Sequence, residues 1–273
     1  INFLKMDGFK TKSVSRISKT DYNADFTIIS ETQKIINDYK PNFVINLVAL
    51  TSVEECQRDI QKAYLLNTKV VENITQVLSQ DFPRVNFIQI STDHVYGSIG
   101  PHKEDSIELK NIYALSKFSG EIAARNIPSM ILRTNFVGRS SVIGRESMSD
   151  WVVNSLKNKK SIKVFDDVYF NPITINRLSQ IIGHLIETPI PGTYNLGCHD
   201  GVSKADFDFK LAQRLNLDVS LMERISENDA KFLHAPRPKD MRMDSSLFER
   251  TFSILLPTMD EIINDLVNEY DDS

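Results

Sequence analysis

The chain alternates between apolar runs of strand length and longer stretches with helical periodicity, and few folds accommodate that order. The run FVINLVA at 43–49 is apolar almost throughout, as in strands buried on both faces of a parallel sheet. Similar runs follow at 85–90, 130–137 and 193–197. Between them, apolar residues recur at three- and four-residue spacings over 56–80 and 112–125, which is the period of an amphipathic helix. The order predicts an α/β fold with a doubly wound, parallel, Rossmann-like sheet.

The remaining pattern places further elements around this core. Residues 10–17 predict a short strand, and 30–40 predict a helix with Ser30 as its N-cap. From about residue 139 the alternation loosens. Helices are expected there at 147–157, 174–187, 203–215 and 258–269.

The charged residues and cysteines exclude several classes of function. A net charge of −4 gives the chain no overall attraction to nucleic acid or to an anionic membrane. Cys56 and Cys198 stand far apart, so they form neither a metal-binding pair nor a disulfide framework, which favours a reducing, cytoplasmic setting. The 5 histidines show no ligand spacing, so we expect no metal. No apolar run approaches the roughly 20 residues that span a bilayer, so we expect no membrane partner.

Tyr113 and Lys117 stand four residues apart on a predicted helix, so both side chains leave the same face. An ammonium beside a phenol lowers the phenol pKa, which suits the tyrosine to general acid–base catalysis. Alone, the spacing is more typical of an exposed pair of side chains on a helix. Thr92, however, ends a predicted parallel strand, where open α/β sheets bind their ligands, although a simple capping role would also explain it.

The stretch at 90–121 resembles the extended short-chain dehydrogenase/reductases, and most closely the dTDP-4-dehydrorhamnose reductase family. The resemblance rests on an ordered set of motifs: Ser91-Thr92-Asp93, Tyr96, Glu104-Asp105, Tyr113, Lys117 and Gly120-Glu121. Further landmarks lie upstream at 41–59 and Asn67, and downstream at 132–138, 192–197 and Arg237-Pro238.

The resemblance implies a dinucleotide-binding domain over 1–138, rejoined by about 160–200. A smaller C-terminal substrate lobe would comprise mainly 139–159 and 201–273. The family begins with a strand and a glycine-rich turn whose N–H groups meet a pyrophosphate. Here Gly8 is the one glycine before Gly97, so the first strand and glycine-rich turn are expected to be missing, by truncation rather than by loss. A chain without them should bind a dinucleotide weakly.

The resemblance also implies a role for individual side chains. Thr92 would anchor the substrate carbonyl oxygen, Tyr113 would protonate it, and Lys117 would lower the tyrosine pKa and hold the nicotinamide ribose. The residues expected to bind the cofactor are Arg16, Asp25, Phe26, Leu47, Val48, Ala49, Asn67, Tyr113 and Lys117. Those expected to bind the substrate are Asp93, His94, Val95, Asn135, Phe136 and Arg237.

The expected function is NADPH-dependent reduction of a nucleotide-diphospho 4-keto-6-deoxysugar, in deoxysugar and cell-surface polysaccharide synthesis. Arg16 would accommodate a 2′-phosphate, which favours NADPH, with NADH as the alternative. The bulk of Leu47 and Val48 departs from the small residues that the family places beside the cofactor. Two other readings stay open, a non-catalytic nucleotide-binding regulatory subunit like the methionine adenosyltransferase β subunit, and a sugar-nucleotide epimerase. The partner would be a nucleotide sugar, and a homodimer stays open.

Overall fold

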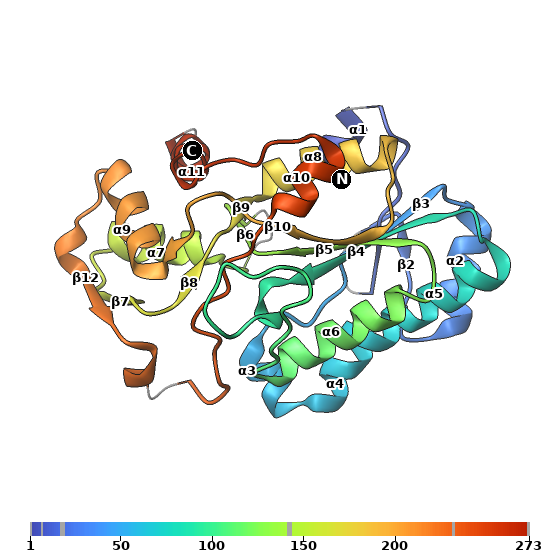
Figure 1. Ribbon diagram of the computed structural model, residues 1–273, viewed down its shortest axis with the longest axis horizontal. Helices are drawn as coiled ribbons and strands as arrows, with labels where there is room; N and C mark the ends of the chain where they lie inside the picture. The colour runs from blue at the N-terminus through green and yellow to red at the C-terminus, as the bar shows by residue number, and fades with distance from the viewer. Residues whose placement is uncertain (1, 7, 17–19, 141–143, 231–232, 272–273) are drawn as a thin grey trace. The chain divides into compact units, whose positions relative to one another are not determined.

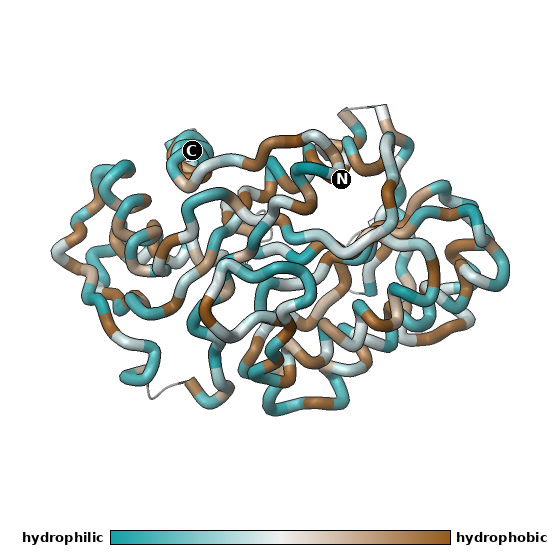
Figure 2. The backbone as a smooth tube through the Cα atoms, in the orientation of Figure 1, coloured by the Kyte–Doolittle hydropathy of each residue, from teal (hydrophilic) through white to brown (hydrophobic). Residues whose placement is uncertain are grey.

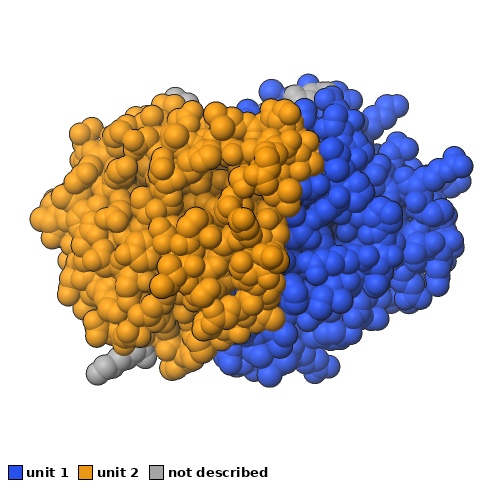
Figure 3. Space-filling model, in the orientation of Figure 1, with its two compact units in different colours: residues 1–95, 111–133, 179–194 blue, residues 96–110, 134–178, 195–273 orange. Residues whose placement is uncertain are grey.

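The computed structural model describes residues 2–6, 8–16, 20–140, 144–230 and 233–271. The chain divides into two compact units, coloured separately in Figure 3. Unit 1 comprises 1–95, 111–133 and 179–194, and unit 2 comprises 96–110, 134–178 and 195–273.

The largest sheet has four strands, in the order β10-β5-β4-β3 (Figure 1). They are β3 (Phe43–Asn46), β4 (Asn86–Thr92), β5 (Ser129–Thr134) and β10 (Gly192–Leu196). Strands β3 and β4 run parallel, with Asn46 opposite Gln89. All six residues of β5 are buried, as a strand with both faces covered requires. The predicted α/β fold with a parallel sheet is confirmed.

The helices of unit 1 follow the predicted periodicity. They are α1 (Asn2–Met6), α2 (Ile29–Tyr39), α3 (Val53–Arg58), α4 (Ile60–Tyr64), α5 (Val70–Asp81), α6 (Ile112–Ala124) and, from Ser179 onward, most of α8 (Ile175–Glu187). In Figure 1, α2, α5 and α6 lie together on one side of the sheet, and their apolar residues form one core with Phe87 of β4 and Ile131 of β5. The alternation of hydrophilic and hydrophobic positions along these helices is visible in Figure 2.

One stretch of the helix predicted over 56–80 is not α-helical. Residues Leu65–Lys69 form a π-helical turn between α4 and α5, and they bury Asn67 and Thr68. A π-turn inserts an extra residue into the hydrogen-bonding pattern and often marks a functional region.

The N-terminal part of unit 1 differs from the expectation in detail. The strand predicted at 10–17 is β1 (Val14–Ser15), which pairs in parallel with β2 (Tyr22–Asn23) in a separate two-stranded sheet. The prediction of Ser30 as N-cap is wrong, because α2 begins after Ile28, which has no side-chain cap. The hydrophobic surface that α2 buries through Ile36 therefore stabilises the helix without that cap.

Unit 2 is built from short strand pairs and helices. Its pairs are β6 (Phe136–Val137) with β9 (Ile173–Thr174), β7 (Ile162–Phe165) with β12 (Met222–Ile225), and β8 (Tyr169–Phe170) with β11 (Val202–Ser203). Its helices are α7 (Met148–Lys157), the start of α8 (Ile175–Glu187), α9 (Lys204–Arg214), α10 (Ser246–Phe252) and α11 (Met259–Asp271). Ser147 and Asp150 form a reciprocal capping box that fixes the start of α7.

The boundaries of the two compact units differ from those of the predicted functional domains. Residues 96–110 and 160–178 belong to unit 2, whereas the prediction placed both in the dinucleotide-binding part. The functional division of the chain stays a prediction. None of the helices in the described ranges is long and apolar enough to cross a membrane.

Candidate active site

The end of β4 and the start of α6 bring the three predicted catalytic residues into unit 1. Thr92 is the last residue of β4, and a short 3-10 turn, Asp93–Val95, follows it. The side chain of Asn111 caps α6 by accepting a hydrogen bond from the N–H of Ala114 at 2.8 Å. This cap sets the helix phase that places Tyr113 and Lys117 among the buried residues of α6.

Tyr113 is a buried phenol that holds its proton. Burial raises its pKa well above the ordinary range, while a hydrogen bond with Thr92 acts in the opposite direction and the charge of Asp93 raises it further. The ring of His94 packs edge-on against the phenol ring, with 5.2 Å between centroids. At neutral pH the hydroxyl is therefore a hydrogen-bond donor that can give up its proton to a stronger base.

Lys117 is buried four residues further along α6. Its Nζ donates to the carbonyl oxygen of Ile90 at 2.6 Å. Burial lowers its pKa to about 8, and the charge of Glu121 acts in the opposite direction. The amine is therefore mainly protonated at pH 7, and its predicted effect on the pKa of Tyr113 stays a prediction.

The segment after β3 presents apolar side chains next to this strand end. Asn46 fixes the turn, because its Nδ2 donates to Gln89 at 2.8 Å and its Oδ1 accepts from the N–H of Val48 at 3.1 Å. Leu47 and Val48 are 64% and 38% exposed, unusual for large apolar residues, and Ala49 is half-buried. Since β3 and β4 are parallel neighbours, this segment leaves the same sheet edge as Thr92.

Asn67, predicted to contact the cofactor, is only 1% exposed. Its Oδ1 accepts from the N–H of Leu50 at 2.7 Å, and its Nδ2 donates to the Leu50 carbonyl at 3.1 Å and to Ser116 Oγ at 2.9 Å. The amide thus ties the segment after β3 to α6.

The predicted ribose- and adenine-side residues lie next to β1 and β2. Arg16 and Asp25 form an ion pair at 3.4 Å, with side chains 49% and 26% exposed. Although burial raises the pKa of Asp25, hydrogen bonds from Thr27 and the charge of Arg16 lower it overall. Phe26 packs against the core of unit 1, and its carbonyl accepts from Thr32 and Asn73.

The predicted substrate residues fall into two groups. Asp93 and Val95 are buried and His94 is half-buried, all in unit 1 next to Thr92. Asn135, Phe136 and Arg237 belong to unit 2. Phe136 is 49% exposed, Asn135 accepts at its carbonyl from the N–H of Ile173 at 2.8 Å, and Arg237 is half-buried.

Sequence reasoning gave no role to a buried ion pair next to Lys117. Glu121 on α6 and Arg133 on β5 are both fully buried and pair through their side chains, and Ser91 also donates to Glu121. A signal was present, because Arg133 stands inside an apolar run, and a buried arginine needs an acidic partner.

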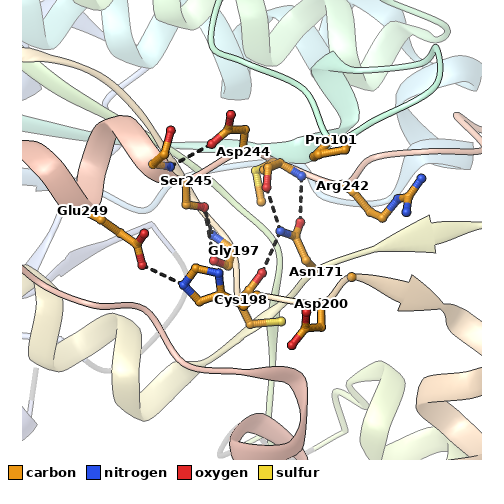
Figure 4. Close-up of a pocket in the computed structure, with 13 residues that line it drawn as sticks. Pro101, Asn171, Gly197, Cys198, Asp200, Arg242, Asp244, Ser245 and Glu249 are labelled. Atoms are coloured by element: carbon orange, nitrogen blue, oxygen red, sulfur yellow. Dashed lines mark hydrogen bonds and ion pairs between the residues drawn. The ribbon is translucent and has the colours of Figure 1, made fainter.

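A cavity of about 340 Å³ lies in unit 2 (Figure 4). In its lining, Asn171 Nδ2 donates hydrogen bonds to the carbonyl oxygens of Cys198 and Met243. The Nε2 of His199 lies 2.9 Å from Oε1 of Glu249. Its lining includes none of the predicted site residues. Among the described side chains, no group of three or more His, Cys, Asp or Glu could hold a metal ion.

Comparisons with known proteins show that the chain is similar to sugar-nucleotide and glycan reductases. A family model described as "RmlD substrate binding domain" matches residues 5–272. The probable low-salt glycan biosynthesis reductase Agl14 of Haloferax volcanii is 25% identical over 247 residues, which cover 88% of this chain and 81% of that protein. The dTDP-4-dehydrorhamnose reductase of Salmonella typhimurium is 23% identical over 257 residues, covering 88% and 84%.

A solved structure agrees on the fold. The dTDP-4-dehydrorhamnose reductase of Bacillus anthracis, in complex with NADP, superimposes with a TM-score of 0.83 at 23% identity, covering 93% of this chain and 90% of that one. At that identity the likeness concerns the fold.

Proposed function

The chain belongs to the RmlD substrate binding domain family, and from this premise we propose that it reduces a nucleotide-diphospho 4-keto-6-deoxysugar with NADPH. The reaction would serve deoxysugar and cell-surface polysaccharide synthesis, in keeping with relatives named as glycan and dTDP-4-dehydrorhamnose reductases. The activity would fall among the NAD(P)-dependent oxidoreductases of the EC 1.1.1 type, in the short-chain dehydrogenase/reductase superfamily. The observation that carries the proposal is the grouping of Thr92, Tyr113 and Lys117 at the end of β4.

The described residues fit the nicotinamide half of the cofactor. Leu47 and Val48 expose apolar side chains after β3 that can pack against a planar ring, although they are larger than the residues the family places there, and Lys117 supplies a charged donor for ribose hydroxyls. Arg16 offers a guanidinium for a 2′-phosphate, because half of its side chain is exposed beside Asp25. When bound, NADPH supplies the hydride that reduces the sugar carbonyl.

Side chains of the protein then orient the carbonyl, donate the proton and stabilise the charge that the proton leaves behind. Thr92 donates a hydrogen bond to the carbonyl oxygen, which orients it. Tyr113 gives its proton to the oxyanion as the carbonyl is reduced, and its raised pKa ensures that the proton is present at neutral pH. The positive charge of Lys117 stabilises the phenolate that remains.

Two of the predicted substrate residues in unit 2 have side chains suited to a nucleotide sugar. The exposed ring of Phe136 can stack on a sugar or base, and Arg237 can pair with a diphosphate. A cytoplasmic location and a homodimer stay predictions.

The proposal is tested by following NADPH absorbance while the natural protein acts on a dTDP-4-keto-6-deoxysugar. We expect stoichiometric oxidation of NADPH, with no reaction on dTDP-glucose, which has no keto group. Absence of turnover with every nucleotide 4-keto sugar, together with tight binding of a partner protein, would support the regulatory alternative. An epimerised product formed without consumption of NADPH would support the epimerase.

A further inference from the structure

A fully buried ion pair joins α6 to β5 beside the catalytic residues. Arg133 Nε donates to Glu121 Oε1 at 2.9 Å, and Arg133 Nη2 donates to Oε2 at 2.6 Å. Neither side chain is exposed to solvent. Ser91 Oγ also donates to Oε1, at 2.5 Å. A carboxylate with these donors is held in one orientation and carries its charge in the interior.

This pair continues the row of catalytic side chains along α6. Tyr113, Lys117 and Glu121 follow at four-residue intervals, so they share one helix face. Their partners are three consecutive residues at the end of β4. Thr92 bonds Tyr113, the carbonyl of Ile90 accepts from Lys117, and Ser91 donates to Glu121. The position of the helix face on the strand end thus depends on all three contacts.

Glu121 is also the carboxylate that opposes the effect of burial on Lys117. Burial lowers the pKa of Lys117 to about 8, and the charge of Glu121 is the larger of the two effects that raise it. The other comes from Cys56, whose thiol is neutral at pH 7 because burial raises its pKa to about 11.

Five further elements surround this helix face: α3, α4, the π-turn, α5 and the 3-10 turn after β4. In α3 the buried residue is Cys56, whereas the charged Glu54 and Glu55 are half-buried and Arg58 is exposed. Asp93 and His94, in the 3-10 turn, act on Tyr113. The α4 helix, the π-turn and α5 contribute buried residues that carry no charge. Examples are Ala63, Asn67, Thr68 and Val71.

We propose that Glu121 is a positioning residue of the reductase site, which, with Ser91 and Arg133, holds Lys117 at the end of β4 and keeps it charged. It thereby sets the alkaline limit of the reaction. The inference rests on the proposed function only for its link to catalysis, because the charge of Lys117 can be measured without substrate.

The test replaces Glu121 by Gln, which keeps an acceptor for Ser91 and removes the charge. NMR of ¹³Cε-labelled lysine follows the titration of Lys117, assigned by the loss of its signal in Lys117→Met. Without the neighbouring negative charge, the ammonium is less stable, so the titration midpoint should fall by about one pH unit or more. The alkaline limb of kcat, measured from pH 6 to 10, should move in the same direction.

Two further variants separate charge from structure. Arg125→Gln removes a partly exposed partner that lies 3.3 Å from Glu121, and it should leave both midpoints unchanged. Glu121→Gln leaves Arg133 buried without its ion-pair partner. The double variant with Arg133→Met therefore tests the effect of the Glu121 charge on Lys117 in a chain that buries no isolated arginine. We expect the double variant to shift both midpoints in the same direction by a smaller amount.

A folded single or double variant with an unchanged Lys117 midpoint would overturn the inference, even if kcat fell at every pH. A shifted Lys117 midpoint in a protein that reduces no nucleotide sugar would instead leave the inferred electrostatic role intact and contradict the proposed function.

Discussion

At the scale of single residues, the chemistry depends on what burial does to two neighbouring groups. Burial favours the neutral form of each, so the phenol of Tyr113 keeps its proton while the ammonium of Lys117 becomes easier to deprotonate. The two effects define a working range, because a general acid must hold its proton while the neighbouring cation still carries its charge. The upper end of that range lies near the pKa of Lys117, at about 8.

Removing the hydroxyl of Tyr113 should affect the reaction and leave binding intact. In Tyr113→Phe we expect kcat to fall by about 10²–10⁴, the usual contribution of a general acid, with little change in substrate affinity. Steady-state kinetics with NADPH and the keto sugar measure both quantities. Tyr64→Phe, at an exposed position of α4, is the matched control and should behave as the unmodified protein. Full activity in Tyr113→Phe would show that another group donates the proton.

Arg16 is predicted to determine the choice between NADPH and NADH. Arg16→Ala removes a charge-assisted contact to the 2′-phosphate, worth about 1.5–3 kcal/mol, so the KM for NADPH should rise by about 10- to 100-fold. The KM for NADH should hardly change, because NADH has no such phosphate. Lys12→Ala removes another exposed cation near β1, paired with Asp21, and serves as the control. An equal loss for both cofactors would remove Arg16 from the site.

At the scale of elements, the close packing of α6 on the π-turn determines where the catalytic side chains lie. Thr68 Oγ1 donates to the carbonyl of Ser116 at 2.8 Å, and Asn67 contacts the Ser116 hydroxyl. A Cβ on Gly120 would lie 2.4 Å from the carbonyl oxygen of Asn67. Glycine is therefore required by the close approach of two backbones.

This approach makes Gly120→Ala an informative substitution. Helix propensity alone would stabilise the alanine variant by about 1 kcal/mol, but the overlap is with backbone and forces the elements apart, at about 1–3 kcal/mol or more. We expect the overlap to dominate, lowering the free energy of unfolding measured in urea and reducing kcat. Ser119→Ala, one residue away, controls for propensity. A more stable Gly120→Ala protein would show that α6 can move freely.

A second element, α9, carries a buried acid that should make unit 2 more stable at low pH. Burial raises the pKa of Asp208 to about 7, Lys204 opposes this, and Oδ1 has no hydrogen-bond partner among the described residues. The unfolded chain releases this proton near the ordinary pKa of about 4, so stability is lost as pH rises from there to about 7.

Replacing this acid should remove that dependence. Asp208→Asn should raise the free energy of unfolding at pH 8 by about 1–3 kcal/mol, which is the ionisation penalty less the cost of burying an amide. At pH 4 the gain should disappear. Urea unfolding at both pH values checks this, with Asp38→Asn, exposed on α2, as the control for charge. An equal effect at both pH values would mean that the pKa of Asp208 is the same in the folded and the unfolded chain.

The sequence predicted these elements better than it predicted their contacts. A β-branched apolar run located β4, whose residues are buried on both faces. Periodicity located α6, α7, α8, α9 and α11, because each of these helices buries one repeating apolar face, but it did not locate α10. It did not reveal the π-turn, since Asn67 and Thr68 owe their burial to α6, a distant segment. Ser30 resembled an N-cap, although the N-cap of α2 is Ile28, two residues earlier. The pairing of Glu121 with Arg133 depends on how a helix lies on two strands, which no local pattern specifies.

At the scale of the whole molecule, the predicted site residues are divided between the two units. Thr92, Tyr113 and Lys117 belong to unit 1, together with the residues expected to hold NADPH. Asn135, Phe136 and Arg237 belong to unit 2. The predicted catalytic and cofactor residues thus belong to unit 1, whereas the predicted substrate residues are divided, because Asp93, His94 and Val95 also belong to unit 1. Substitutions among the substrate residues of unit 2 could therefore change specificity while the reaction is kept.

The central claim is that this chain directs hydride transfer to the C4 carbonyl of a nucleotide-linked sugar. The most direct measurement uses NADPH carrying deuterium at the transferred position, with the natural protein and a dTDP-4-keto-6-deoxysugar, followed by NMR of the product. The account predicts one deuterium at C4 of the reduced sugar for each NADP⁺ formed, and a loss of this product in Tyr113→Phe. Formation of NADP⁺ with no deuterium at C4, or a sugar left unreduced by a protein that binds both ligands, would contradict it.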